Sequence, residues 1–397
     1  MKLENSPLTT NFLKDVESKY SKIGLFWGSL VLLTSCYVAN NSKWLLMKFG
    51  SSGAGKTITD KIALETYGER LNPLYITGRL TPAGLVKLVK LARRSYRILT
   101  QLEKFRSTGL IFVEDLSRCT THYLKLTSLQ FLAGLTRNTS FDDLTSDGGI
   151  IGLDLGDEPK KAMLAGTPSD WEEIASTSIY NEFVDRRSLT VISLMSPEEW
   201  ENREKRAIHS LLLKTDEEII KEWKNLLVKQ EVKPYFGKIE LRVFPQDRLR
   251  LYRKLSRFKK YPENLFQMID SLAEGHARIN GRDRVLAEDY EILNKIFSRY
   301  LVLSDMRKKE LFIAEEVIRS PDGCLSIEDL IYRLRVRAKE EEIPSLTKTS
   351  STINDYLSFS KYLTLNTRKG QVFISLSPYL RNIFQDWNKE VEEIITC

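Results

Sequence analysis

The residues whose types and spacing point most directly to chemistry form a short glycine-rich stretch. Residues 50–57 read Gly-Ser-Ser-Gly-Ala-Gly-Lys-Thr. This is the pattern of a phosphate-binding loop (P-loop), in which backbone amides cradle phosphate oxygens, the lysine reaches the β and γ phosphates, and the last hydroxyl coordinates magnesium. The predicted nucleotide-binding residues are therefore Gly50, Ser51, Ser52, Gly53, Ala54, Gly55, Lys56 and Thr57.

Such a loop binds phosphate only when a strand before it and a helix after it hold it in place. The apolar residues of Trp44–Phe49 predict a buried strand, and Thr57–Leu64 has the spacing of a helix. The N-terminus of that helix adds a favourable dipole for an anion. The sequence therefore predicts binding of ATP and Mg²⁺, with Lys56 on the phosphates and Thr57 on the metal.

A second feature is a pair of carboxylates directly after another apolar run. Leu110–Val113 predicts a strand, and Glu114 and Asp115 follow it. Carboxylates at the carboxyl end of a strand near a P-loop can hold magnesium and orient the attacking water. The usual order of this pair is Asp then Glu, and here it is reversed. We therefore predict that both residues act in metal binding and catalysis, and which residue does which stays open.

Two further polar residues accompany the next predicted strands. Thr167 follows the apolar run 162–166, so its hydroxyl can reach the attacking water or the γ-phosphate, the role called sensor 1. Arg186 precedes the predicted strand Leu189–Leu194. An arginine in this place can enter the ATP site of a neighbouring subunit and stabilise transition-state charge. Both residues are predicted to be catalytic.

With these four elements in this order, the chain resembles ATPases of the AAA+ family. Residues 40–300 are most similar to the branch with a β-hairpin before sensor 1, which includes the minichromosome maintenance (MCM) helicases. Tyr75–Leu85 resembles the segment that follows the second strand in that branch, and Ser271–Asp289 resembles its helical lid. The same order of segments also resembles uncharacterised ATPases of phages and mobile elements.

The resemblance implies a DNA-binding hairpin and a ring. Gly149–Asp154 and Lys160–Leu164 can pair across the residues between them, as in the hairpin that carries lysines into a central pore. Lys160 and Lys161 would then contact DNA, and the chain would form a homo-oligomer, a hexamer.

Two departures from that branch limit the resemblance. Only about forty residues precede the predicted P-loop strand, and they contain no pair of cysteines for a zinc-binding domain. The lid position at which the family would place its sensor 2 arginine holds Asn264. Arg257, Lys259 and Lys260 are nearby substitutes. The sensor 2 residue therefore stays open.

The C-terminal segment has the pattern of a winged helix-turn-helix domain. It predicts three helices and then two strands joined by the basic turn Arg368-Lys-Gly370, a good hairpin signal. In such a domain the third helix enters the major groove and the wing touches the DNA backbone. The expected helices are Arg307–Arg319, Ser326–Lys339 and Thr347–Phe359, and the strands are Tyr362–Thr367 and Gln371–Leu376. The predicted DNA-binding residues here are Lys348, Ser351, Arg368 and Lys369.

Composition bounds these expectations. The chain has 397 residues, of which 42% are hydrophobic and 28% are charged, with a net charge of +7. This length and balance are typical of a globular protein with more than one domain, and the positive charge suits a polyanionic partner without requiring one. We expect an α/β fold in which helices sandwich the parallel sheet of an AAA+ core. The expected parts are an N-terminal helical segment (1–40), the nucleotide-binding core (41–200), a helical lid and linker (201–303) and the winged helix (304–397).

The uncharged run Ile23–Ala39 comes close to the length of a membrane span. Its polar residues, including Thr34 and Ser35, favour instead a buried helix packed on the nucleotide-binding core. The four cysteines are far apart and fit neither a zinc site nor a disulfide framework. We therefore expect no membrane association and a cytoplasmic location.

The leading functional expectation is a ring-forming ATPase that couples hydrolysis to DNA translocation, unwinding or remodelling, as an MCM-like replicative helicase of a virus or mobile element. A second reading is an ATP-switched initiator or regulator that binds DNA through the winged helix without helicase activity. A third is a chaperone-like or signalling ATPase whose winged helix binds protein. Stimulation of ATP hydrolysis by DNA distinguishes the third reading from the first.

Overall fold

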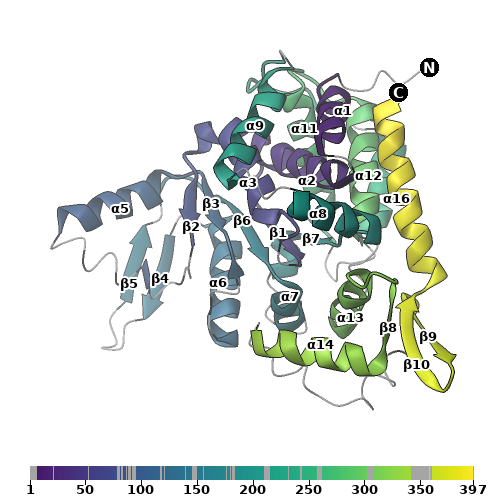
Figure 1. Cartoon of the computed structure of the whole chain (residues 1–397). Helices are drawn as coiled ribbons and strands as arrows, with labels where there is room; N and C mark the ends of the chain where they lie inside the picture. The colour runs from purple at the N-terminus through teal and green to yellow at the C-terminus, as the bar shows by residue number, and fades with distance from the viewer. Residues whose placement is uncertain are drawn as a thin grey trace.

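The structure is a computed structural model of the whole chain (Figure 1). It describes residues 7–396 with the exception of 21, 52, 78–80, 82–83, 86, 88–90, 92–94, 117–118, 120, 139, 145–149, 155, 176, 179, 181–183, 210–214, 231, 242–243, 257–261, 302–307, 341–356 and 358–359. All statements below concern the described residues.

A five-stranded parallel sheet forms the centre of the molecule. Its spatial order is β2-β3-β6-β1-β7, so β6 lies between β3 and β1. Four of these strands, all except β2, were expected from apolar runs in the sequence, and the predicted α/β class with a parallel sheet flanked by helices is confirmed. The strands are β1 (Leu45–Gly50), β2 (Leu74–Ile76), β3 (Leu110–Val113), β6 (Lys161–Gly166) and β7 (Ser188–Ser193).

Successive side chains of a strand point to opposite faces of the sheet. The strands therefore contribute residues to two hydrophobic clusters, one on each face. On one face, Leu46 and Phe112 join a cluster that continues into the N-terminal helices and the helices that follow the sheet. On the other face, Met47 and Val113 join a second cluster, which includes residues of the helices that connect the strands. Those connecting helices are α5 (Tyr96–Ser107), α6 (His122–Leu135) and α7 (Pro168–Ala175). The helix that follows the P-loop, α3 (Lys56–Tyr67), lies on the first face, against α2.

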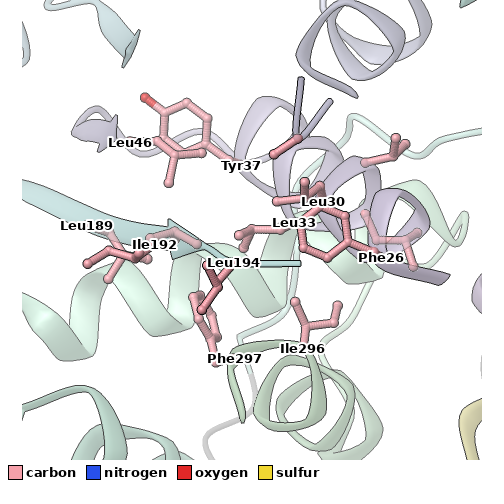
Figure 2. Packing of buried hydrophobic residues seen from close by; sticks show 14 of the residues in the cluster. Phe26, Leu30, Leu33, Tyr37, Leu46, Leu189, Ile192, Leu194, Ile296 and Phe297 are labelled. Carbon is pink, nitrogen blue, oxygen red and sulfur yellow. The ribbon is translucent and has the colours of Figure 1, made fainter. Parts of the chain in front are cut away.

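The uncharged N-terminal run is a buried helix, as expected. It forms α2 (Lys22–Ala39), which packs against α1 (Pro7–Tyr20), α3 and three of the helices that follow the sheet. Side chains of α2 such as Phe26 and Leu33 lie in one cluster with Leu194, which directly follows β7, and with Phe297 of α12 (Figure 2). No helix among the described residues is long and apolar enough to cross a bilayer.

Five helices follow the sheet and surround α1 and α2. Thr215 begins one of them with a capping box, because its hydroxyl accepts from the Glu218 amide while the Glu218 carboxylate accepts from the Thr215 amide. α11 packs along α2, α10 and α12. The helices are α8 (Pro197–His209), α9 (Asp216–Val228), α10 (Pro245–Ser256), α11 (Leu265–Ile279) and α12 (Ala287–Leu301).

The predicted pairing of the hairpin before sensor 1 is wrong. β5 (Ile150–Asp154) pairs antiparallel with the preceding strand, β4 (Ser140–Leu144), and not with residues 160–164. The latter belong to β6, both edges of which are occupied by β1 and β3. A strand in the middle of a sheet has no free edge for another partner. The β4–β5 hairpin therefore stands beside α5, apart from the central sheet (Figure 1).

The C-terminal segment forms a second, small sheet with order β8-β10-β9. The two-residue turn between β9 and β10 has positive φ at Lys369 (50°) and Gly370 (81°), as a tight hairpin turn requires, so the predicted hairpin is confirmed. The predicted third helix, Thr347–Phe359, lies almost entirely outside the described residues. The elements are α13 (Lys308–Ile318), β8 (Cys324–Ser326), α14 (Ile327–Glu340), β9 (Leu363–Arg368) and β10 (Gln371–Leu376).

Two contacts tie this segment to the rest of the molecule. α13 packs against α7, the helix that follows β6. A last helix that the sequence analysis did not predict, α16 (Pro378–Thr396), runs back along α12 and reaches α1 (Figure 1). The chain thus ends beside the helices with which it begins.

Candidate phosphate-binding site

The glycine-rich loop has a backbone that other residues would strain. Gly53 and Gly55 have φ of 76° and 75°, in the left-handed region. A Cβ atom on Gly53 would lie 2.2 Å from Nη2 of Arg203, and one on Gly55 would lie 2.4 Å from Nε1 of Trp27. These glycines therefore serve both the turn and the close approach of neighbouring side chains.

Lys56 begins α3 and folds back over the loop. Its Nζ donates to the carbonyl oxygens of Gly50 (2.6 Å) and Ser51 (2.8 Å), and the residue is only 9% exposed. These acceptors belong to the loop itself. A phosphate oxygen placed in the loop would therefore be within the range of the same ammonium group.

Hydrogen-bond donors without acceptors surround the loop. The Ser51 hydroxyl and the Trp27 indole N–H are buried and have no partner among the described residues. No side chain caps α3, whose N-cap residue is Gly55, so its first amides also lack side-chain acceptors. Buried donors normally find acceptors, and an anion in the loop would supply them. Ala54 is buried, Thr57 is half-buried in the first turn of α3, and Ser52 lies outside the described residues.

The sheet brings the other predicted residues to the end of its strands at which this loop lies. Phe49 pairs with Gly166 and Val113 pairs with Leu164, so β1, β3 and β6 end close together. Because the strands are parallel, their carboxyl ends lie on one edge. Thr167 and the acidic pair therefore lie on the P-loop side of the sheet, with the Thr167 strand in the middle.

Glu114 is bound to the P-loop helix. Its Oε1 lies 2.8 Å from Nζ of Lys61, one turn into α3, and its amide donates to the Ile76 carbonyl. Burial, with the nearby carboxylates of Glu65 and Glu114, raises the pKa of Tyr75 on β2 to about 12. Asp115 is half-buried.

The residues present can serve magnesium only together with a nucleotide. Among the described residues, no group of three His, Cys, Asp or Glu side chains could hold a metal ion by itself. Magnesium commonly takes one or two carboxylates and completes its shell with phosphate and water. A hydroxyl at Thr57 and carboxylates at Glu114 and Asp115 fit that requirement.

Thr167 is held in place by its neighbours. Its hydroxyl donates to Oδ2 of Asp170 (2.9 Å) and accepts from the Asp170 amide (3.3 Å), the reciprocal pattern of a helix cap at the start of α7. Asp170 in turn pairs with Lys125 (2.8 Å), which is also near Glu173. Because these contacts use the hydroxyl's hydrogen and one lone pair, one lone pair is left to accept a hydrogen bond.

Arg186 lies at the opposite end of the sheet, at the amino ends of the strands. It is exposed in the short 3₁₀ helix Asp185–Arg187, directly before β7, whose first residue pairs with Leu45 at the start of β1. A six-residue strand spans roughly 20 Å, so Arg186 is that far from its own P-loop. Its backbone carbonyl accepts from the side chain of Asn264, so the position expected for sensor 2 also lies at this edge. The substitutes Arg257, Lys259 and Lys260 fall outside the described residues.

Lys160 and Lys161 are not at the tip of a hairpin, and we correct their assignment to DNA contact. Both are buried. Lys160 Nζ donates to the carbonyls of Arg106 and Thr108, and Lys161 Nζ donates to the Tyr37 carbonyl and to Oδ1 of Asn40 (2.8 Å). Burial lowers the pKa of Lys161 well below its usual value. These lysines anchor the connection before β6 and the end of α2.

Sequence reasoning missed three residues around the loop. Lys48, on β1, is fully buried, pairs with Asp60 of α3 and donates to the Thr34 hydroxyl of α2 (2.6 Å). Burial and the charge of Lys56 lower its pKa well below the usual value. Trp27 and Arg203 contact the glycines from α2 and α8. A charged residue inside an apolar strand was a visible signal for Lys48, but nothing local marked the other two.

The basic residues of the C-terminal hairpin are accessible. Arg368 ends β9 and Lys369 occupies the turn, and both are exposed. The other two predicted DNA-binding residues of this segment, Lys348 and Ser351, lie outside the described residues.

No model of a known protein family matches the sequence, and no curated protein is significantly similar to it.

Proposed function

We propose that this protein is a P-loop ATPase of the AAA+ type that couples ATP hydrolysis to translocation on, unwinding of or remodelling of DNA. One observation carries the ATPase part. A loop with two left-handed glycines, orphaned donors and Lys56 lies at the same end of the sheet as Glu114, Asp115 and Thr167. The strand order, which places the Thr167 strand between the P-loop strand and the acidic strand, supports the same proposal.

Each residue of the site has a role that its position permits. Lys56 and the loop amides bind the β and γ phosphates, and Thr57 with one carboxylate holds Mg²⁺, which neutralises phosphate charge. The other carboxylate orients the attacking water. Thr167 accepts a hydrogen bond from that water, because its own proton is already directed to Asp170.

Arg186 acts on a neighbouring subunit in this proposal. It is exposed and roughly 20 Å from its own loop, so it can reach a phosphate only across an interface. That requirement supports a ring, and a hexamer is the assembly we propose. Arginine at such an interface would stabilise transition-state charge and make hydrolysis depend on assembly.

The DNA part of the proposal depends on the C-terminal segment. Its sheet order and its helices support a winged-helix domain, with the exposed Arg368 and Lys369 on the wing. Two cations at a hairpin tip suit the phosphate backbone and not the reading of bases.

One contact favours the alternative of an ATP-switched initiator or regulator. Arg319, at the end of α13, stacks on Trp200 of α8, which also carries the Arg203 side chain that touches the P-loop. The C-terminal segment is therefore placed to respond to nucleotide, as a DNA-binding switch would be.

ATP turnover by the purified protein, with and without single-stranded and duplex DNA at two salt concentrations, tests these proposals. Salt-sensitive stimulation by DNA supports a DNA motor, because phosphate contacts weaken as salt rises. A strand-displacement assay then separates a helicase from a switch. Turnover that no DNA changes would rule out the motor and favour a protein partner, and absence of turnover under all conditions, including high protein concentration, would contradict the ATPase itself.

A further inference from the structure

Two arginines and a tryptophan form a stack next to the P-loop. Trp200 and Arg203 are one turn apart on α8, and Arg319 directly follows α13. The guanidinium carbons of Arg203 and Arg319 each lie 4.7 Å from the centre of the Trp200 ring. We call these three residues the Trp200 stack. It joins α8 to the C-terminal segment.

Arg203 also covers the phosphate-binding loop. The position that a Cβ atom on Gly53 would take is 2.2 Å from its Nη2 and 2.8 Å from its Cζ. The guanidinium therefore lies directly against the loop at Gly53, where a side chain on the loop would displace it. A fork of N–H donors placed here suits the bidentate binding of phosphate oxygens.

The charge of Arg203 is poorly compensated. Among the described residues it forms neither a hydrogen bond nor an ion pair, and only Glu204 exerts a favourable field on it. Burial and the nearby Arg319 lower the pKa of Arg203, because both disfavour its charged form. Lys56 adds a third positive charge at the same loop.

Arg319 shares its counterion. Its guanidinium lies 3.6 Å from the Glu316 carboxylate, which also binds Arg337 at 3.0 Å, while Arg337 additionally pairs with Glu315. The buried carboxylates of α13 are thus divided between two arginines. Docking of α13 places Arg319 close to another cation, and like charges at short range disfavour that arrangement.

We propose that Arg203 binds the phosphate chain of the nucleotide, and that this contact strengthens the docking of the C-terminal segment through Trp200 and Arg319. The inference depends on the nucleotide site proposed above and adds its regulation. A phosphate next to Arg203 compensates its charge and removes the repulsion that Arg319 experiences on docking. Coupling of this kind is reciprocal, so docking of Arg319 also raises nucleotide affinity.

Nucleotide affinity tests the contact. We would measure binding of ATP and ADP calorimetrically to wild type, Lys56→Ala, Arg203→Ala, Arg203→Lys and Arg319→Ala. Arg203→Ala should weaken binding by about 10- to 100-fold, the effect of losing a charged hydrogen bond. Arg203→Lys should be intermediate, because lysine keeps the charge without the fork. Arg319→Ala should weaken binding by about threefold, the smaller effect of a coupled site.

A matched control lies on the same helix. Lys205 is exposed and pairs with Glu201 on the surface. Lys205→Ala removes a positive charge from α8 without touching the loop or the Trp200 stack, and it should leave affinity unchanged. If Lys205→Ala and Arg203→Ala weaken nucleotide binding equally, the loss reflects only the net charge of the protein. That result would contradict a contact between Arg203 and the phosphates.

Hydrogen–deuterium exchange of residues 308–326 tests the coupling. In wild type, a saturating non-hydrolysable ATP analogue should slow exchange in this segment by about threefold or more, while Arg203→Ala and Arg319→Ala at saturation should show no such change. Unchanged or faster exchange in wild type with nucleotide bound would overturn the coupling.

The outcomes separate the two proposals. If wild type binds neither ATP nor ADP, the nucleotide site is wrong and this inference falls with it. If Lys56→Ala loses binding while Arg203→Ala binds as tightly as wild type, the site stands and the Arg203 contact is wrong.

Discussion

A buried lysine lies at each end of the strands of the central sheet, and each donates hydrogen bonds to protein oxygens. The two lysines serve different purposes. At the carboxyl edge, Lys56 donates to the carbonyls of Gly50 and Ser51. At the amino edge, Lys161 donates to the Tyr37 carbonyl and the Asn40 side chain. Burial and acceptor type are similar at the two sites. Only the surroundings of the acceptors differ.

That difference shows when a buried lysine can exchange its acceptors for a ligand. The acceptors of Lys56 belong to a loop with two left-handed glycines and orphaned donors nearby, so a phosphate could replace them and gain further bonds. The acceptors of Lys161 belong to the end of a fully buried helix, where nothing else could satisfy them. We therefore infer that Lys56 acts in binding and that Lys161 holds the fold.

The largest expected effect is a loss of ATP turnover on substitution of Lys56, at the carboxyl ends of the strands. Lys56→Ala should lower ATP turnover by at least about 10²-fold, as loss of a donor to developing charge does. It should change the free energy of unfolding by about 1 kcal/mol or less, because removal of the Lys56 charge relieves its repulsion with the buried Lys48 and offsets the two lost hydrogen bonds. Steady-state ATPase assays and urea unfolding measure the two quantities. Lys205→Ala again serves as the control. Full turnover in Lys56→Ala would contradict the site.

The corresponding change at the amino edge should affect stability alone. Lys161→Ala leaves two buried oxygens without a donor, so we expect a loss of about 2–4 kcal/mol in the free energy of unfolding. Lys161→Met should lose less, because it fills the same space. ATP affinity of the folded fraction should not change in either variant. A stable Lys161→Ala protein with weakened DNA binding would restore the assignment that the structure has corrected.

Smaller losses of turnover and stability are expected on substitution of Thr167, which is proposed to act in catalysis and also caps α7. Thr167→Val keeps the shape but removes the hydroxyl, and it should lower turnover by about tenfold and stability by about 1 kcal/mol, the usual value of a helix cap. Thr167→Ser keeps the hydroxyl and should retain most of the turnover. If Thr167→Val hydrolyses ATP at the normal rate, the hydroxyl serves only the cap.

The smallest effect, a modest loss of DNA affinity, is expected in the exposed β9–β10 hairpin, which is not part of the central sheet. Arg368→Ala combined with Lys369→Asn removes two charges while asparagine tolerates the positive φ of the turn. DNA affinity should fall by a few-fold, and the salt dependence, the slope of log K against log salt, should decrease by about 2. Lys229→Gln, which neutralises an exposed lysine after α9, is the control. Unchanged affinity would favour a protein-binding role for this segment.

The sequence predicted what depends on local pattern. Four of the five strands of the sheet were expected from apolar runs, whereas the short β2 was not predicted. The glycine-rich loop, the positions of Glu114 and Thr167 at strand ends, the buried α2 and the C-terminal hairpin also followed from neighbouring residues. Each boundary lies within a few residues of the prediction.

What depends on distant partners could not be predicted. Residues 149–164 contain two segments that alternate well enough to pair, and only the rest of the sheet decides that Lys161 lies between β1 and β3. The spacing of Trp200 and Arg203 on one helix face was visible, but the arrival of Arg319 from another part of the chain was not. The late helix α16 lay beyond the elements that a winged helix requires, so it was missed.

The burial of the N-terminal helices has a consequence for synthesis on the ribosome. Thr9 of α1 bonds to His276 of α11, 267 positions later, and the Cys36 carbonyl of α2 lies against Gly275 so closely that a Cβ there would be only 1.8 Å away. At about 5–20 residues per second, the chain needs tens of seconds to produce α11 after α2 has emerged. During that interval the face of α2 that α11 covers has no native partner. We therefore expect the newly made chain to depend on chaperones that bind exposed apolar segments.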